Sequence, residues 1–85
     1  MTALIIEDEI YAQDELKRML NNSNHNVEVL DCIDTVEDSV QWLKNNPNPD
    51  IIFLDVQLAD GLSFEIFKDV EVESPIIFTT AFENY

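Results

Sequence analysis

Four short apolar runs, separated by stretches of helical periodicity, are the feature that most limits how this chain can fold. The runs are residues 3–6, 27–33, 51–54 and 76–78. The first, third and fourth are continuous and are rich in β-branched or aromatic side chains, as is typical of strands buried on both faces of a parallel sheet. The second run alternates polar and apolar residues, which favours a position at the edge of that sheet.

Apolar residues recur at helical spacing in the three segments between the runs. The expected helices are residues 9–22, 35–45 and 62–70, with Asp34 or Thr35 as the N-cap of the second. Their apolar faces are formed by Ala12, Leu16, Met19 and Leu20, by Val36, Val40 and Leu43, and by Leu62, Ile66 and Val70. This alternation of strand and helix implies an α/β fold, in which a doubly wound parallel sheet has helices on both faces and right-handed crossovers. The 85 residues suffice for one domain.

The charge balance is strongly acidic, with 18 Asp and Glu against 4 Lys and Arg and a net charge of −14. Such a chain repels the phosphates of DNA, RNA and anionic membranes and favours cations. No apolar run approaches the roughly 20 residues of a membrane span, and the N-terminus lacks the pattern of a signal peptide. The single cysteine, Cys32, has no partner for an internal disulfide and is expected to be a small buried residue. A cytoplasmic protein is the simplest interpretation.

Acidic and hydroxyl side chains follow three of the predicted strands. Glu7 and Asp8 follow the first, Asp55 follows the third, and Thr80 lies just beyond the fourth. Ligands of doubly wound sheets bind beyond the carboxyl ends of the strands, so these side chains converge if strands one and three are neighbours. Carboxylates about 4 Å apart repel by roughly 1 kcal/mol even in water, and oxygen ligands favour Mg²⁺. For any one of these acids taken alone, a solvated loop start is the simpler interpretation.

A carboxylate beside Mg²⁺ can also act as a nucleophile toward phosphorus and form an acyl phosphate. Thr80 would then offer its hydroxyl to a phosphoryl oxygen, although by itself it is equally well explained as a β-prone residue at a strand end. Gly61, the only glycine, either permits a positive φ in a tight loop near the site or marks an ordinary turn. His25 lies in a loop at the opposite end of the sheet and is expected to be a surface residue.

Three stretches of the chain resemble the successive signatures of response-regulator receiver domains of two-component systems. They are residues 4–9, 50–55 and 75–81, and the resemblance covers the entire chain. It implies a flavodoxin-like sheet of order 2-1-3-4, with the family's fifth strand and last helices missing. Residues 55–58 and 78–85 look most like the LytTR subfamily, in which a DNA-binding domain follows the receiver. Any DNA binding would therefore belong to a C-terminal domain that is absent from this chain.

The resemblance also implies a role for each candidate residue. Asp8 would ligate Mg²⁺ directly, Glu7 through water, and Gln57 through its backbone carbonyl. Asp55 would be both a metal ligand and the phosphoacceptor, and Thr80 would be the switch residue that contacts the phosphoryl group. The donor in the family is a phosphohistidine on a sensor histidine kinase. The domain would thus be a phosphoacceptor that assists its own phosphorylation and dephosphorylation, and not a conventional enzyme.

The chain departs from the family pattern at three points. Ala59 stands where a proline is common, in a loop that is shorter here, and Glu7 stands where Asp is commoner. The family's lysine after the fifth strand has no counterpart, because the four bases all fall in predicted helices: Lys17, Arg18, Lys44 and Lys68. We therefore expect residues 1–85 to be a receiver domain that is incomplete at its C-terminus and lacks about 40 residues. Residues 76–78 would then form an exposed edge, which predicts a homodimer or edge-paired self-association.

Three other functions compete with this interpretation. A receiver-like interaction module that works without phosphorylation would explain the missing lysine, but it leaves the combination of three acids and a threonine unexplained. A Mg²⁺-dependent phosphatase with a similar sheet usually needs an Asp-x-Asp pair, and Gln57 stands at the second position here. A flavodoxin-like nucleotide or flavin binder would need a Gly-, Ser- or Thr-rich loop after the first strand, where residues 7–9 are acidic instead.

Overall fold

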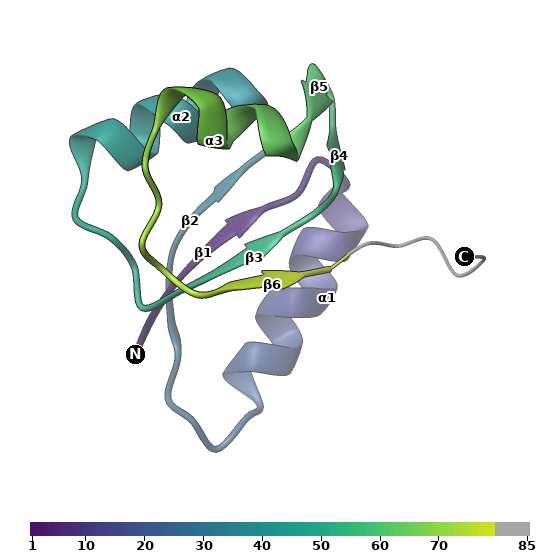
Figure 1. Ribbon diagram of the computed structural model, residues 1–85. Helices are drawn as coiled ribbons and strands as arrows, with labels where there is room; N and C mark the ends of the chain where they lie inside the picture. The colour runs from purple at the N-terminus through teal and green to yellow at the C-terminus, as the bar shows by residue number, and fades with distance from the viewer. Residues whose placement is uncertain (80–85) are drawn as a thin grey trace.

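The computed structural model describes residues 1–79 and shows a parallel sheet between two layers of helices (Figure 1). The strands of the sheet are β1 (Thr2–Ile6), β2 (Glu28–Ile33), β3 (Ile51–Leu54) and β6 (Ile76–Phe78). The helices are α1 (Ile10–Asn21), α2 (Val36–Asn45), the short 3-10 turn η1 (Ser63–Glu65) and α3 (Ile66–Asp69). α2 and α3 cover one face of the sheet and α1 covers the other, which confirms the predicted architecture. Within residues 1–79, the helices are too short or too polar to cross a membrane.

The strands are ordered β2-β1-β3-β6, and all neighbours are parallel. This confirms the expected order 2-1-3-4, because β6 is the fourth strand of this sheet along the chain. Ile6 is paired with Leu54 on one side and with Ile33 on the other, so the residues after β1 and β3 leave the sheet side by side. Two hydrogen bonds continue the ladders there. The Glu7 N–H donates to the Ile33 carbonyl (2.8 Å), and the Asp55 N–H donates to the Ile6 carbonyl (2.9 Å).

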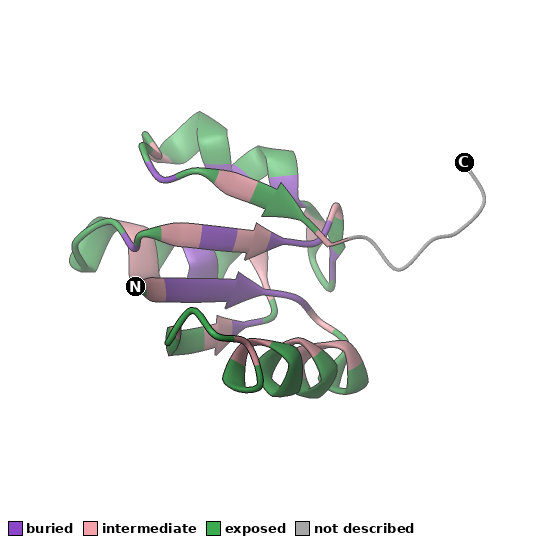
Figure 2. Ribbon diagram, turned by 90° about the horizontal axis from the view of Figure 1, so that it is seen from below, coloured by how far each residue is buried: buried purple, intermediate pink, exposed green. Residues whose placement is uncertain are grey.

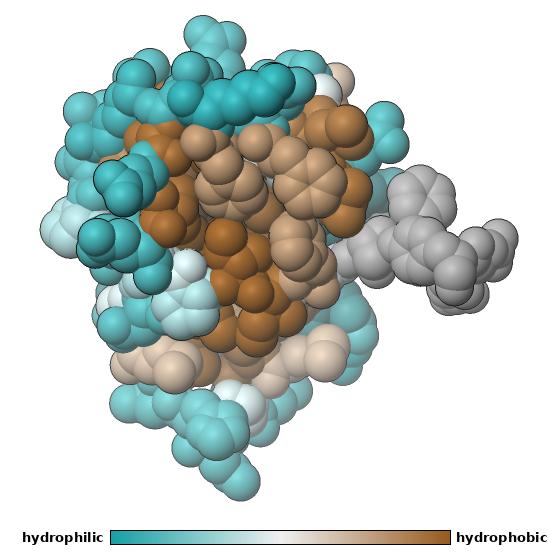
Figure 3. Space-filling view, viewed as in Figure 1, coloured by the Kyte–Doolittle hydropathy of each residue, from teal (hydrophilic) through white to brown (hydrophobic). Residues whose placement is uncertain are grey.

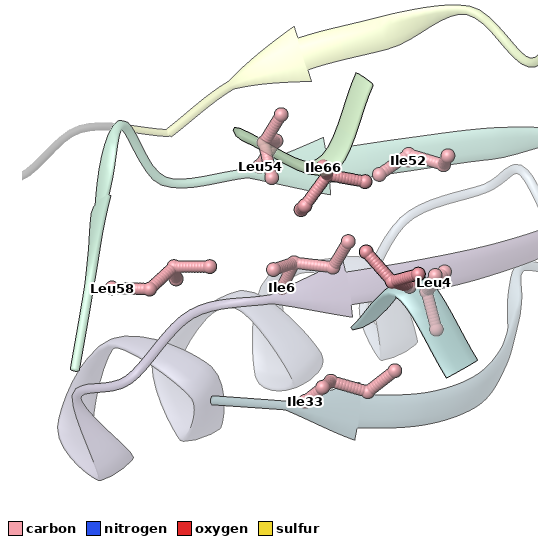
Figure 4. Close-up of a cluster of buried hydrophobic side chains, with 8 residues drawn as sticks. Leu4, Ile6, Ile33, Ile52, Leu54, Leu58 and Ile66 are labelled. Carbon is pink, nitrogen blue, oxygen red and sulfur yellow. The ribbon is translucent and has the colours of Figure 1, made fainter. Parts of the chain in front are cut away.

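The main core lies between the sheet and the layer formed by α2 and α3 (Figure 4). Because side chains alternate across a strand, every second residue of β1 and β3 enters this core. Burying each such Leu or Ile side chain stabilises the fold by roughly 1.5–3 kcal/mol. The eight core residues are each no more than 6% exposed: Leu4, Ile6, Ile33, Val40, Ile52, Leu54, Leu58 and Ile66. Ala3 and Ile5, which alternate with them in β1, are fully buried on the α1 side.

β6 forms the exposed edge that was expected from the resemblance to receiver domains for a chain without the family's fifth strand. Ile77 is 47% exposed and Phe78 is 49% exposed, although a continuous apolar run is typical of a strand buried on both faces. Among residues 1–79, β6 pairs only with β3, so its outer side faces no neighbouring strand. Figure 2 shows the contrast with β1, which is buried along nearly its whole length. β2 forms the other edge, as its alternating pattern predicted.

α1 packs on the sheet less closely than expected, since none of its residues is buried. Met19 was predicted on the apolar face but is 60% exposed, because the centre of the contact surface lies away from it. Cys32, on the edge strand β2, is half-buried rather than buried. The half-buried residues of α1 are Ala12, Gln13, Leu16 and Leu20.

A short antiparallel hairpin, formed by β4 (Gln57–Leu58) and β5 (Gly61–Leu62), follows β3 and was not predicted. Gly61 has a φ of 150°, which confirms that a positive φ is needed in this loop. The hairpin takes up Leu62, so helical structure begins only at Ser63, and α3 is shorter than the predicted helix over residues 62–70. Leu62, expected on the apolar face of that helix, is 48% exposed.

Candidate metal centre

Three carboxylates meet at the carboxyl ends of β1 and β3. One oxygen from each of Glu7, Asp8 and Asp55 lies within 4.8 Å of the others. The pairing of β1 with β3 brings them together, because Glu7 and Asp8 follow β1 directly and Asp55 follows β3. In the part of the chain that the structure describes, no other three acidic, histidine or cysteine side chains are gathered in this way. The convergence of the three acids predicted from the sequence is therefore present.

The acid cluster, defined as Glu7, Asp8 and Asp55, combines buried and accessible groups. Glu7 is 3% exposed and Asp55 is 8% exposed, whereas Asp8 is more open to solvent. The ion pairs found within residues 1–79 join surface residues of α1 and of the η1–α3 segment, so none of them neutralises the cluster. Like charges repel more strongly in a partly dry site than in water. The cluster therefore favours a cation that reaches it from the side of Asp8.

The pKa of Glu7 reflects this crowding. Burial, together with the neighbouring Asp55 carboxylate, raises the pKa of Glu7 from its ordinary value of 4.5 to about 7. The Glu9 N–H opposes the shift by donating a hydrogen bond to Glu7 Oε2 at 3.1 Å. Near neutral pH, Glu7 is thus partly protonated when no cation neutralises its neighbours. A divalent cation at the cluster would favour the charged form.

Gln13 holds the segment that carries the acid pair. Its side-chain Nε2 donates to the Glu7 carbonyl oxygen at 2.6 Å, and its own N–H donates to the Glu9 carbonyl at 3.0 Å. Sequence reasoning did not single out Gln13. The available signal was a polar residue next to Ala12 and Leu16 on the face of α1 that turns toward the sheet. Because Gln13 restrains the main chain of Glu7, it helps to set where the acid pair leaves β1.

The other candidate residues are placed less directly. Gln57 begins β4, two residues after Asp55, and its side chain is exposed. Its contact with a metal through the backbone carbonyl stays a prediction. Thr80 lies outside the described residues. Thr79, which the sequence analysis passed over, donates its N–H to the Leu54 carbonyl at 3.0 Å. The Thr79 hydroxyl oxygen is buried and finds no hydrogen-bond partner among residues 1–79, and such a group calls for a polar partner.

The donor set of the acid cluster fits a hard divalent cation. All three side chains offer oxygen, and Mg²⁺ is usually bound by one or two carboxylates while it keeps several waters. His25 lies in the loop between α1 and β2, at the opposite end of the sheet, so it adds no nitrogen ligand. The chemistry of the residues present therefore agrees with Mg²⁺.

A model of a known protein family, described as the response regulator receiver domain, matches residues 3–85. The chain belongs to this family. It is 40% identical over 88 residues to the sensory transduction protein LytT of Bacillus anthracis and 32% identical to LytT of Bacillus subtilis. Each match covers the whole of this chain, but only 35% and 36% of the two proteins. The receiver domain thus resembles LytT-type response regulators and spans about a third of their length.

Solved structures of response regulators share the fold of this receiver domain. The N-terminal domain of a response regulator/sensory box/GGDEF protein from Carboxydothermus hydrogenoformans gives a TM-score of 0.82 at 24% identity. That match covers all of this chain and 68% of the other. The MaeR response regulator bound to beryllium trifluoride gives 0.81 at 21% identity, over 99% of this chain and 70% of that one. At these identities the likeness establishes the flavodoxin-like fold and nothing finer.

Proposed function

We propose that this receiver domain accepts a phosphoryl group on Asp55, in a reaction that depends on Mg²⁺ at the acid cluster. The observation that carries the proposal is the placement of Asp55, which is 8% exposed and gathered with Glu7 and Asp8 at the carboxyl ends of adjacent strands. Family membership supplies the reaction class, because response regulators of two-component systems are phosphorylated on a carboxylate. The proposed donor is a phosphohistidine of a sensor histidine kinase.

Each residue of the site has a defined part in the proposed reaction. An Asp55 oxygen attacks the phosphorus atom, and its bond to phosphorus forms as the bond from phosphorus to the donor imidazole nitrogen breaks. Asp8 would bind the metal directly, Glu7 through water and Gln57 through its backbone carbonyl. When bound, Mg²⁺ would neutralise the charge that develops on the transferring phosphoryl oxygens. The buried main chain on both sides of the cluster holds the nucleophile in place before the donor arrives.

Thr80 is the proposed switch residue, which would donate its hydroxyl hydrogen to a phosphoryl oxygen. It directly follows Thr79, whose N–H is bonded to the end of β3. Thr80 would thus lie near the carboxyl end of β3, where Asp55 follows that strand.

We also propose that residues 1–85 are one receiver unit that is incomplete at its C-terminus. In support, the chain covers 68% and 70% of two solved chains that match nearly all of it. By analogy with LytT proteins, of which it spans about a third, this receiver domain would control an output domain that binds DNA and lies outside this chain. The receiver domain itself, with its net charge of −14, is not expected to touch DNA. We place its action in the cytoplasm, where sensor kinases draw phosphoryl groups from ATP.

The test is intact mass spectrometry of the full natural protein after incubation with Mg²⁺ and acetyl phosphate. We expect a gain of one phosphoryl group, which disappears when Mg²⁺ is chelated and is absent in Asp55→Asn. Asp50→Asn is the matched control, because Asp50 is an exposed acid at the opposite end of β3 and its substitution should leave phosphorylation intact. No gain of mass in the folded wild type would reject Asp55 as the phosphoacceptor.

The alternative is a receiver-like module that signals by binding alone, and the distribution of bases would favour it only if the natural protein supplied no lysine beyond residue 85. All four bases of the chain lie in α1, α2 or α3, and none reaches the acid cluster: Lys17, Arg18, Lys44 and Lys68. A phosphoryl group on Asp55 would therefore lack a basic partner within residues 1–79. This alternative is the better account under two conditions. The full protein takes up no phosphoryl group although it binds Mg²⁺, and Asp55→Asn binds the partner as tightly as the wild type does.

A further inference from the structure

Asp60, at the tip of the β4–β5 hairpin, reaches the start of a helix that is distant in sequence. Its Oδ1 accepts a hydrogen bond from the Val36 N–H at 2.7 Å, and its Oδ2 accepts one from the Glu37 N–H at 3.2 Å. The next N–H of α2, that of Asp38, donates to the Thr35 hydroxyl at 3.0 Å. The first three free N–H groups of α2 are therefore all satisfied, two of them by a residue from another element.

This arrangement satisfies more N–H groups at the start of α2 than an ordinary N-cap residue does. The first turn of a helix leaves N–H groups without partners, and a Ser, Thr, Asp or Asn at the N-cap usually satisfies one of them. Thr35 already fills that place in α2. Asp60 adds a negative charge at the positive end of the helix dipole, where a carboxylate is favoured. The hydrogen bond from Val36, more than any other interaction, lowers the pKa of Asp60, so the carboxylate is charged at neutral pH.

The hairpin has few other attachments. Each of its strands has two residues, and a two-stranded hairpin by itself is only marginally stable in water. Its base is closed where the N–H and the hydroxyl of Ser63 both donate to the Val56 carbonyl, at 2.8 and 3.1 Å. Leu58 is 3% exposed and packs in the core. Near the tip, the Ala59 N–H lies 3.4 Å from the Asp34 carbonyl, which is a long hydrogen bond. The two bonds of Asp60 are therefore the strongest attachment of the tip.

We propose that Asp60 is a positioning residue that ties the tip of the hairpin to the N-terminus of α2 and so holds the segment from Asp55 to Gly61 in one place. The proposal rests on the proposed function, because the group it would position for the metal is the Gln57 carbonyl. Gln57 lies between the nucleophile and the tip, in a strand of only two residues. A shift of the tip would therefore move this carbonyl relative to the acid cluster.

The consequence for metal binding follows from the demands of the ion. Mg²⁺ requires near-ideal octahedral geometry, so a ligand on a loose segment must be ordered when the ion binds. Removing a partner that orients a metal ligand typically weakens metal affinity by about tenfold or more. Asp60 touches no metal ligand atom itself, and its effect would pass through the backbone of the hairpin.

The experiment compares Asp60→Ala with Thr35→Ala in the full natural protein. Both variants remove capping bonds from the same end of α2, but only the first detaches the hairpin. Two quantities are measured: the Mg²⁺ dissociation constant by calorimetry, and amide hydrogen exchange of residues 57–63 without Mg²⁺. We expect Asp60→Ala to raise the dissociation constant by about tenfold and to speed exchange in the hairpin. Thr35→Ala should lower the melting temperature and leave both quantities unchanged. Asp60→Asn retains one acceptor oxygen and should fall between wild type and Asp60→Ala.

The results distinguish a failure of the Asp60 proposal from a failure of the proposed function. Equal changes in the two alanine variants would show that only helix stability matters and would overturn the positioning role. Unchanged exchange of residues 57–63 in Asp60→Ala would overturn the attachment itself. A wild type that fails to bind Mg²⁺ would reject the metal site, and with it the role of Asp60 toward the metal. The exchange comparison would still decide whether Asp60 holds the hairpin.

Discussion

The centre of the sheet and its β6 edge are built from similar residues but are held very differently. Ile6 in β1 is 1% exposed, whereas Ile77 in β6 is 47% exposed. β1 has a strand on each side and helices over both faces, while β6 has a described neighbour only in β3. Figure 3 shows a continuous apolar area on the face of the molecule where β6 and α3 lie in front. Burial therefore depends on the position in the sheet, and not on the hydrophobicity of the strand.

The acid cluster lies on the tightly held side of this comparison. Repulsion among three carboxylates within 4.8 Å of one another destabilises the folded state when no cation is bound. The rest of the fold must offset this free energy. Ile6 and Leu54, the last residues of β1 and β3, are both 1% exposed and anchor the loops that carry the acids. Thr79, in contrast, follows the open strand. The structure thus places the buried Asp55 beside a segment that follows a more exposed strand.

The largest expected effect compares the two isoleucines directly. Ile6→Ala removes a fully buried side chain and should lower the free energy of unfolding by about 2–5 kcal/mol. Ile77→Ala removes a half-exposed one and should cost less than about 1 kcal/mol. Urea unfolding followed by circular dichroism measures both values. Equal losses would mean that the β6 edge is covered in solution and that the contrast between centre and edge does not exist.

A second prediction concerns the cost of the buried acid cluster and its dependence on pH. The pKa of Glu7 is about 7 in the folded chain and near 4.5 when unfolded. The folded state thus binds more protons between these values, and the stability that Glu7 contributes is fully present below pH 4.5 and is lost as the pH rises through 7. The difference in unfolding free energy between wild type and Glu7→Gln, measured without metal, should change across this window. Saturating Mg²⁺ should reduce this change with pH. If the difference in unfolding free energy does not change with pH in the absence of metal, the raised pKa of Glu7 is wrong.

Removal of one charge from the acid cluster should raise the free energy of unfolding, whereas a core mutation lowers it, and the change should be smaller. Asp55→Asn relieves repulsion with Glu7 and Asp8 and should raise the unfolding free energy of the metal-free protein by about 1 kcal/mol at neutral pH. It should also abolish most of the stabilisation by added Mg²⁺. Glu71→Gln, the same change of charge at an exposed loop position, should leave both quantities unchanged. Thermal unfolding with and without Mg²⁺ measures them, and a destabilised Asp55→Asn would show that the carboxylate has favourable contacts instead.

The features predicted from the sequence are those that depend on short-range patterns and on a general rule of sheet topology. The bounds of β3 and β6 and the meeting of Glu7 and Asp8 with Asp55 belong to this group, because parallel strands present their carboxyl ends at one edge. The missed features depend on contacts that no local pattern contains. Asp60 bonds to residues 23 and 24 positions away, and this contact accompanies a hairpin that was not predicted and that lies almost entirely before the expected helix over residues 62–70.

The openness of β6 was predicted from the resemblance to receiver domains, and not from the residues of the strand itself. Its apolar pattern predicts burial on both faces, but burial requires elements beyond the strand, and a pattern within residues 76–78 carries no information about them. Phe78 instead contacts Phe64 of η1 edge to face, with ring centroids 5.8 Å apart, and both rings remain about half exposed. The aromatic pair therefore stabilises the Phe78 end of β6, while Ile76 at its other end packs against the main core.

The smallest expected effect tests whether this open edge attracts a second copy of the chain. Exposed strand edges pair with other strands unless charged side chains prevent it, and β6 carries no charge whereas β2 carries Glu28 and Asp31. We therefore expect the 85-residue chain to dimerise weakly through β6. Ile77→Lys should shift sedimentation toward the monomer, because a charge at the pairing edge must be desolvated. Leu30→Lys, at a 39% exposed position of β2, is the matched control and should leave the dimer unchanged. If the wild type stays monomeric at high concentration, the Phe64–Phe78 pair and the shortness of the strand are enough to prevent edge pairing. The β6 edge would then differ from the centre of the sheet in burial but not in its tendency to associate.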